Sequence, residues 1–141
     1  MKILSLCAIA ALSALAATTC LAADAPPALP AHSLAVGDKT LSYLSTGRGP
    51  AVIVVHGVGG HKEDWQGVAA ALGKTHRVYA IDMLGFGGSS KNGDDLSMPV
   101  QARAIRALLD HQHIKRADLV GNSVGGWVTA CLLYTSPSPR D

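Results

Sequence analysis

The apolar residues of this chain are concentrated in three short runs, and each run ends in a segment rich in glycine. The runs cover residues 51–55, 77–81 and 117–120. The first contains only alanine, valine and isoleucine, a composition typical of a strand that is covered on both faces. We therefore expect three strands of one sheet, each followed by a loop with little side-chain cover.

Between these runs the apolar spacing becomes helical. The first predicted helix has apolar residues at positions i, i+3, i+4 and i+7, namely Trp65, Val68, Ala69 and Leu72. The second begins at Pro99 and carries an apolar stripe formed by Val100, Ala104 and Leu108. Strands that alternate with helices predict an α/β fold with a mostly parallel sheet and helices on both faces.

The segment before the first buried run has a different pattern. Residues 34–36 and 41–44 are apolar-rich and flank the turn pair Gly37-Asp38, which predicts an antiparallel hairpin at the edge of the sheet. Residues 24–32 contain three prolines and predict an extended lead into the domain. We place the folded domain at residues 33–130.

The third predicted strand leads directly into Gly121-Asn122-Ser123-Val124-Gly125, a G-x-S-x-G motif. A serine on a sharp turn between a strand and a helix has an exposed hydroxyl that can attack a carbonyl. Gly121 and Gly125 lack the Cβ atoms that would collide where strand and helix pass closely. A helix that starts at Val124 would also direct the Val124 amide toward the reacting centre. The alternative is that this Gly-Ser segment is only a turn.

A second motif follows the first buried run: residues 56–60 read His-Gly-Val-Gly-Gly. A loop of this type can offer a second amide, that of Val58, to the oxygen that Val124 would hold. We expect His56 to orient the loop by hydrogen bonding rather than to transfer protons. Gly57 belongs to the same structural motif.

The order of these motifs, with residues 85–90 (Gly-Phe-Gly-Gly-Ser-Ser) between them, resembles the α/β-hydrolase fold superfamily and its esterase and lipase-like members. The resemblance covers most of residues 33–130. It implies a nucleophile elbow at Ser123, an oxyanion hole and hydrolysis of an ester, thioester, amide or carbon-carbon bond through an acyl-enzyme, with a carboxylesterase expected first. Ser123 counts against dehalogenases and epoxide hydrolases, whose elbow carries an aspartate. Residues 85–90 are expected to line the pocket mouth.

The rest of a catalytic triad is absent. In the superfamily an acid and then a histidine follow the serine, but after Ser123 the only acid is Asp141 and there is no histidine. Asp82 ends a predicted strand and is better explained by hydrogen bonds to loop amides than as the missing acid. We therefore expect a fold truncated after the elbow. The alternative is a non-catalytic binding module or an inactive fragment.

The two terminal segments of the chain are not expected to belong to the folded domain. Residues 131–141 resemble a translated sequencing adapter, so we expect the native protein to continue differently after Ala130. Residues 1–23, with a basic start and an apolar stretch, predict a bacterial secretory signal peptide and therefore a periplasmic or secreted protein. The stretch is too short for a retained membrane anchor. Acylation at Cys20 is a lesser alternative.

The net charge and the positions of the cysteines limit which ligands and partners we expect. The formal net charge is +2 and the charged residues are not clustered, which does not favour nucleic-acid binding. The three cysteines, Cys7, Cys20 and Cys131, all lie in the terminal segments, so residues 24–130 cannot form a thiolate metal site or a disulfide. We expect a small acyl substrate, no cofactor and no metal.

Overall fold

The structure is a computed structural model that describes residues 28–93 and 95–135. The predicted signal peptide, the start of the proline-rich lead (residues 24–27) and the end of the adapter-like segment (residues 136–141) lie outside the described residues. These assignments stay predictions.

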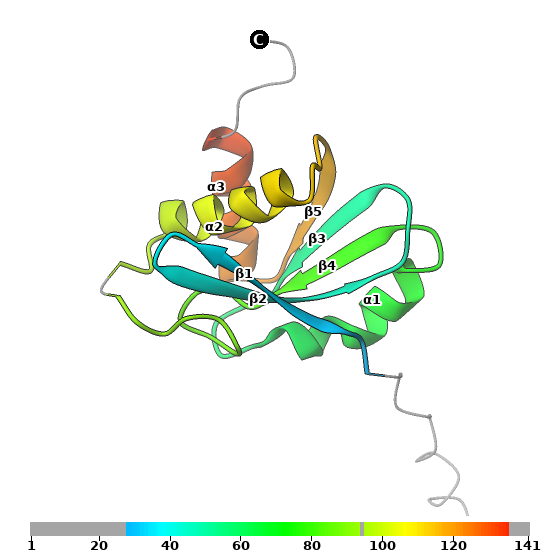
Figure 1. Cartoon of the computed structure of the whole chain (residues 1–141), viewed down its shortest axis with the longest axis horizontal. Coiled ribbons are helices and arrows are strands. Elements are labelled where there is room, and N and C mark those ends of the chain that lie inside the picture. Colours follow the sequence, from blue (N-terminus) through cyan, green and yellow to red (C-terminus); the bar gives the residue numbers. More distant parts are fainter. Residues whose placement is uncertain (1–27, 94, 136–141) are drawn as a thin grey trace, which may run out of the picture.

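Five strands form one sheet, with the spatial order β1-β2-β4-β3-β5 (Figure 1). Their bounds are β1 Ala31–Val36, β2 Lys39–Thr46, β3 Ala51–Val55, β4 Arg77–Ile81 and β5 Ala117–Gly121. The pairs β3/β4 and β3/β5 are parallel, whereas β1/β2 and β2/β4 are antiparallel. The α/β class is confirmed, but the described sheet is mixed rather than mostly parallel, because the edge hairpin joins β4 in the antiparallel sense.

The hairpin is confirmed and begins earlier than expected. Ala31 and His32 pair with Leu44 and Tyr43 in the β1/β2 register. The Ser45 amide also donates a hydrogen bond to the Pro30 carbonyl oxygen at 3.3 Å. Backbone pairing therefore draws the end of the proline-rich lead into the sheet, and the boundary predicted at residue 33 is two residues late.

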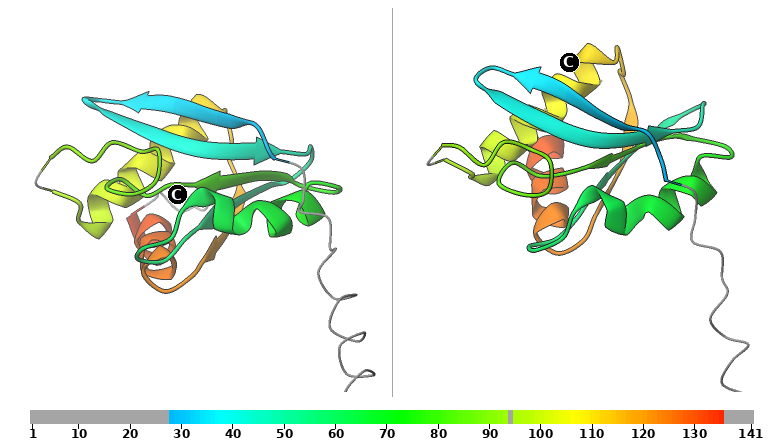
Figure 2. Two further views of the ribbon diagram at one scale, coloured as in Figure 1. Left: turned by 90° about the horizontal axis from the view of Figure 1, so that it is seen from below. Right: turned by 60° about the horizontal axis from the view of Figure 1, so that its bottom comes forward.

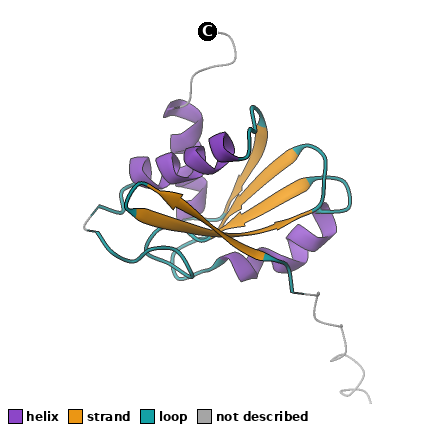
Figure 3. Cartoon of the chain, in the orientation of Figure 1, coloured by secondary structure: helices purple, strands orange, loops and turns teal. Residues whose placement is uncertain are grey.

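Helices cover both faces of the sheet, as Figures 2 and 3 show. The helices are α1 (Gln66–Leu72), α2 (Met98–His111) and α3 (Val124–Thr135), and a 3-10 turn, η1 (Lys62–Trp65), precedes α1. Alternate residues of β3 divide between two apolar clusters: Val52 and Val54 pack with Ala69 of α1, whereas Ile53 and Val55 pack on the face covered by α2 and α3. This alternation explains why β3 is apolar at every position.

Two apolar side chains on the helices are exposed. Val68 is 45% exposed, because α1 is short and only Ala69 is fully buried in it. Trp127 is 73% exposed, since α3 buries one face, with Val128 and Leu132, and turns the other outward. Helix α3 continues past Ala130 and ends at Thr135, before the two prolines. No helix within the described ranges is long and apolar enough to span a membrane.

The open edge of the sheet gives a prediction for residues 24–141 expressed alone. Strand β5 pairs with β3 and with no other described strand, and Val120 on β5 is 40% exposed. An unpaired edge beside exposed apolar side chains favours intermolecular association. We expect this polypeptide to aggregate or to remain partly unfolded in size-exclusion chromatography and thermal melting. A monomer with one sharp, reversible transition would contradict the expectation.

Candidate active site

Ser123 lies at the sharp corner between β5 and α3. Its backbone φ angle is +52°, in the left-handed region that costs a residue other than glycine about 1–3 kcal/mol. The side chain is exposed. The corner therefore holds the Ser123 side chain away from the packed interior in a strained backbone conformation.

The two glycines of the motif permit this corner for a steric reason. A Cβ added to Gly125 would lie 2.4 Å from the Val55 carbonyl oxygen and 2.5 Å from that of His56. A Cβ added to Gly121 would lie 2.4 Å from the backbone of Gly125. The start of α3 therefore contacts the end of β3 through bare backbone.

The first turn of α3 leaves the Val124 amide free. The amides of Gly125 and Gly126 donate to the carbonyl oxygens of Asn122 and Ser123 at 2.8 and 2.9 Å. The Val124 amide donates no hydrogen bond to any residue that the structure describes. It is an unbonded donor at a helix start, next to the serine.

His56, directly after β3, has a hydrogen-bond partner at each ring nitrogen. Its Nδ1 lies 2.6 Å from the Gly57 carbonyl oxygen, and its Nε2 accepts a bond of 3.1 Å from the Met83 amide. A carbonyl oxygen only accepts, so Nδ1 carries the proton and Nε2 is bare. The ring is 2% exposed and meets the edge of Phe86. Both nitrogens are occupied, which agrees with a structural role.

The loop that follows His56 lies beside the serine. A Cβ added to Gly57 would be 3.3 Å from the Ser123 Cβ and 3.4 Å from the Asn122 carbonyl oxygen. Val58 is 72% exposed, and its amide has no acceptor among residues 28–93 and 95–135. The structure therefore brings the two glycine motifs together and leaves the Val58 and Val124 amides without described partners.

A cavity of about 500 Å³ opens next to this loop. Its lining residues are His56, Gly57, Val58, Gly59, Gly60, Asp64, Trp65, Val68 and Asn122. The segment 85–90 does not line it, contrary to expectation. That segment instead bonds to β2: the Ser89 hydroxyl accepts from the Ser42 amide at 2.8 Å, and the Ser90 amide donates to the Thr40 carbonyl oxygen at 2.9 Å.

Below the loop lies a buried ion pair that sequence reasoning missed. Asp82 is fully buried and Lys62 is 6% exposed, and their side chains meet at 2.8 Å. Asp82 also accepts from the Lys62 amide at 2.7 Å and the Gly88 amide at 2.8 Å. The bonds to loop amides expected of Asp82 are therefore present. Lys62 gave no signal, because lysine beside two acids is typical of a solvated surface.

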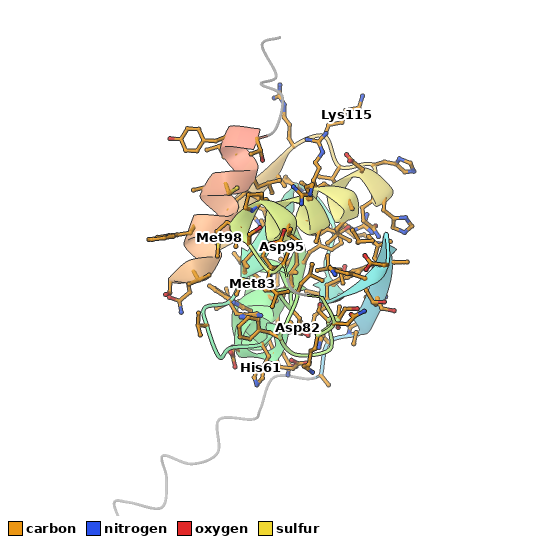
Figure 4. All side chains as sticks on the ribbon, turned by 90° about the vertical axis from the view of Figure 1, so that its left-hand side faces the viewer. His61, Asp82, Met83, Asp95, Met98 and Lys115 are labelled. Atoms are coloured by element: carbon orange, nitrogen blue, oxygen red, sulfur yellow. The ribbon has the colours of Figure 1, made fainter. Side chains whose placement is uncertain are left out.

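Both members of the pair are ionised at neutral pH. Burial alone would raise the pKa of Asp82, but hydrogen bonds from the Lys62 side chain and from the Gly88 and Lys62 amides outweigh burial and lower that pKa. Burial alone would lower the pKa of Lys62, but hydrogen bonds to Asp82 and Glu63 raise it. Figure 4 shows Asp82 and Met83 at the same end of the molecule as His61, the neighbour of Lys62.

The catalytic base and acid expected to follow Ser123 have no counterpart in the described part of the chain. Within that part, no imidazole or carboxylate accepts a hydrogen bond from the Ser123 hydroxyl, and both nitrogens of the buried His56 are bonded elsewhere. The arrangement supplies a placed hydroxyl and two amide donors. It does not by itself activate the hydroxyl.

Comparison with known proteins gives a consistent family. The family model for the alpha/beta hydrolase fold matches residues 50–139. An uncharacterized protein of Mycobacterium tuberculosis is 36% identical over 117 residues, which are 83% of this chain and 34% of that protein. The pimeloyl-[acyl-carrier protein] methyl ester esterase of Aeromonas hydrophila is 35% identical over 99 residues, 70% of this chain and 37% of the esterase.

A solved structure gives the same result. The crystal structure of a membrane phospholipase A, a bacterial virulence factor, superposes with a TM-score of 0.73 at 31% identity. The match covers 77% of this chain and 36% of the phospholipase chain. The chain thus spans about a third of the length of the curated relatives it matches.

The contact between α3 and β3 predicts the effect of one added methyl group. In the full-length protein, Gly125→Ala would force a Cβ against two carbonyl oxygens, and overpacking of this kind costs about 1–3 kcal/mol. Gly126→Ala is the matched control, because its added Cβ would meet no atom closer than 3.5 Å. Urea unfolding should show a clear loss for Gly125→Ala and little change for Gly126→Ala. Equal stability of the two variants would contradict the packing described.

Proposed function

The chain belongs to the α/β-hydrolase fold family, and from this we propose that the full-length protein is a hydrolase whose nucleophile is Ser123. The observation that carries the proposal is the left-handed backbone conformation of Ser123. This conformation places an exposed serine at a strained corner beside the Gly57 loop. Strained backbone of this kind is concentrated at functional sites, which supports a functional role for Ser123.

The proposed reaction is acyl transfer in two steps. The Ser123 oxygen attacks the substrate carbonyl carbon while its proton passes to a histidine, and the Val58 and Val124 amides hold the resulting oxyanion. The leaving group departs with that proton, which gives an acyl-enzyme. Water then attacks the acyl carbon with the same base, releasing the acid product and the free serine.

We propose that the histidine and its orienting acid come from residues outside the described ranges. His56 cannot serve, because its Nε2 accepts from the Met83 amide and its Nδ1 faces the Gly57 carbonyl oxygen. We propose that they follow Ser123 in the order acid, then histidine. A base positioned by a third group is what converts a serine hydroxyl into a nucleophile at neutral pH.

We propose a carboxylic ester as the first substrate class to test. This chain is similar to a methyl ester esterase and to a phospholipase A, which supports an ester. Thioester, amide and carbon-carbon substrates use the same acyl-enzyme chemistry. We further propose that the N-terminal signal directs export of the protein and that no membrane anchor remains after the signal is cleaved. The proposed partner is a small acyl substrate, and we propose no nucleic-acid partner.

A second candidate function is a binding module without catalysis. It is favoured by one observation: within residues 28–93 and 95–135, the Ser123 hydroxyl has no bonded base. The exposed side chains of Val58 and Trp127 would then form part of a ligand surface. The next two predictions separate this alternative from the enzyme.

The first prediction concerns the source DNA. We expect the reading frame that truly follows Ala130 to encode an Asp or Glu and, later, a His at the ends of further strands, because the elbow needs both groups. Sequencing genomic DNA across this point is the measurement. A native frame that lacks either residue would favour the non-catalytic module even with Ser123 intact.

The second prediction concerns the nucleophile. Ser123→Ala in the full-length protein should abolish labelling by a fluorophosphonate probe and lower kcat for an aryl ester by at least about 1,000-fold, as for other serine nucleophiles. Ser33→Ala is the control, since Ser33 is an exposed residue of the edge strand β1. Labelling that survives in Ser123→Ala, or is absent from the unmodified enzyme, would overturn the assignment.

A further inference from the structure

The loop that carries Val58 is held at its two ends rather than along its length. At its start, the His56 ring is bonded to the Met83 amide. At its end, Lys62 is bonded to Asp82 through both its amide and its Nζ atom. Met83 and Asp82 directly follow β4, so the strand next to β3 in the sheet anchors both ends.

Packing cannot fix the middle of this loop. Val58 is 72% exposed, and Gly59, with a φ angle of +77°, has no atom within 4 Å of its Cβ position. Within the loop, the Gly60 amide donates a backbone hydrogen bond to the Gly57 carbonyl oxygen at 3.1 Å, and Val58 and Gly59 lie between these two residues. The place of the Val58 amide therefore follows from where the ends are fixed.

Asp82 gathers the donors that set the far end. Its Oδ1 accepts from the Lys62 amide, while its Oδ2 accepts from Lys62 Nζ and the Gly88 amide. A Cβ added to Gly87 would overlap the Asp82 carboxylate. One carboxylate thus joins η1, the end of β4 and the segment 85–90.

A buried ion pair often contributes no more to the stability of a fold than well-packed apolar residues of similar volume, because both charges lose their hydration. Charges do fix geometry, because each bond has a narrow distance and direction. Lys62 is 6% exposed, and its other partner, Glu63, is about half exposed. A buried, directional ion pair between Lys62 and Asp82 is therefore suited to fixing the position of the loop end.

We propose that Lys62 and Asp82 are positioning residues for the oxyanion hole: their ion pair fixes the end of the 56–61 loop and thereby sets the Val58 amide against Ser123. This inference rests on the proposed function. Neither residue lines the cavity beside Ser123, so both act through the loop. Removing the Lys62 charge should weaken the bound oxyanion more than the bound substrate.

The test compares Lys62→Met with Lys62→Arg in the full-length protein. A displacement of about 1 Å in a catalytic group can cost about 100-fold, so we expect Lys62→Met to lower kcat about 10- to 100-fold with KM within about threefold. Lys62→Arg, which keeps the charge, should recover most of that loss. Arg106→Met is the control: it breaks an exposed pair with Asp110 on α2 and should change neither constant.

A second readout does not depend on catalysis. Amide hydrogen exchange at Gly60, measured by NMR, reports opening of its bond to Gly57 and should be several-fold faster in Lys62→Met than in the unmodified protein. If the unmodified protein shows no Ser123-dependent turnover, the hydrolase proposal fails. The exchange rate still reports whether Lys62 anchors the loop.

Three results would overturn the positioning role. The first is a folded Lys62→Met variant with unchanged kcat. The second is unchanged Gly60 exchange in that variant. The third is failure of both Lys62→Met and Lys62→Arg to fold, which would show that the pair serves the stability of the whole domain rather than the placement of one loop.

Discussion

The close backbone contact between the start of α3 and the end of β3 is the constraint on which this site depends. Gly125 lies so near the Val55 and His56 carbonyl oxygens that a single Cβ would not fit. Because the helix starts there, the two residues before it must turn sharply, and Ser123 takes a left-handed backbone. The exposure of its hydroxyl is a consequence of that packing.

Sequence alone predicted the central strands well, because their determinants are local. The apolar runs at residues 51–55, 77–81 and 117–120 correspond to β3, β4 and β5, whereas the catalytic role of the G-x-S-x-G motif around Ser123 stays a prediction. The hairpin was also predicted, since its turn pair and its alternating flanks are adjacent in the chain.

What the sequence did not reveal depends on contacts between distant residues. Lys62 and Asp82 are twenty positions apart, and nothing in the pattern around Lys62 distinguishes a buried lysine from a solvated one. The exposure of Val68 was missed for a related reason: helical spacing identifies an apolar stripe but not how much of that stripe the sheet covers. The segment 85–90 was placed at the pocket, although its serines bond to β2.

The corner at Ser123 and the loop after β3 are positioned by different interactions. The difference follows from the group that each part exposes. The elbow presents a side chain, so its backbone can be packed tightly against β3. The loop after β3 must present a backbone amide, and an amide kept free for a ligand cannot be fixed by its own hydrogen bond. A loop of this kind needs anchors at its ends. His56 at one end and the Lys62 and Asp82 pair at the other supply them, both tied to the end of β4. The loop can therefore leave the Val58 amide unbonded because buried polar contacts fix the loop at both ends.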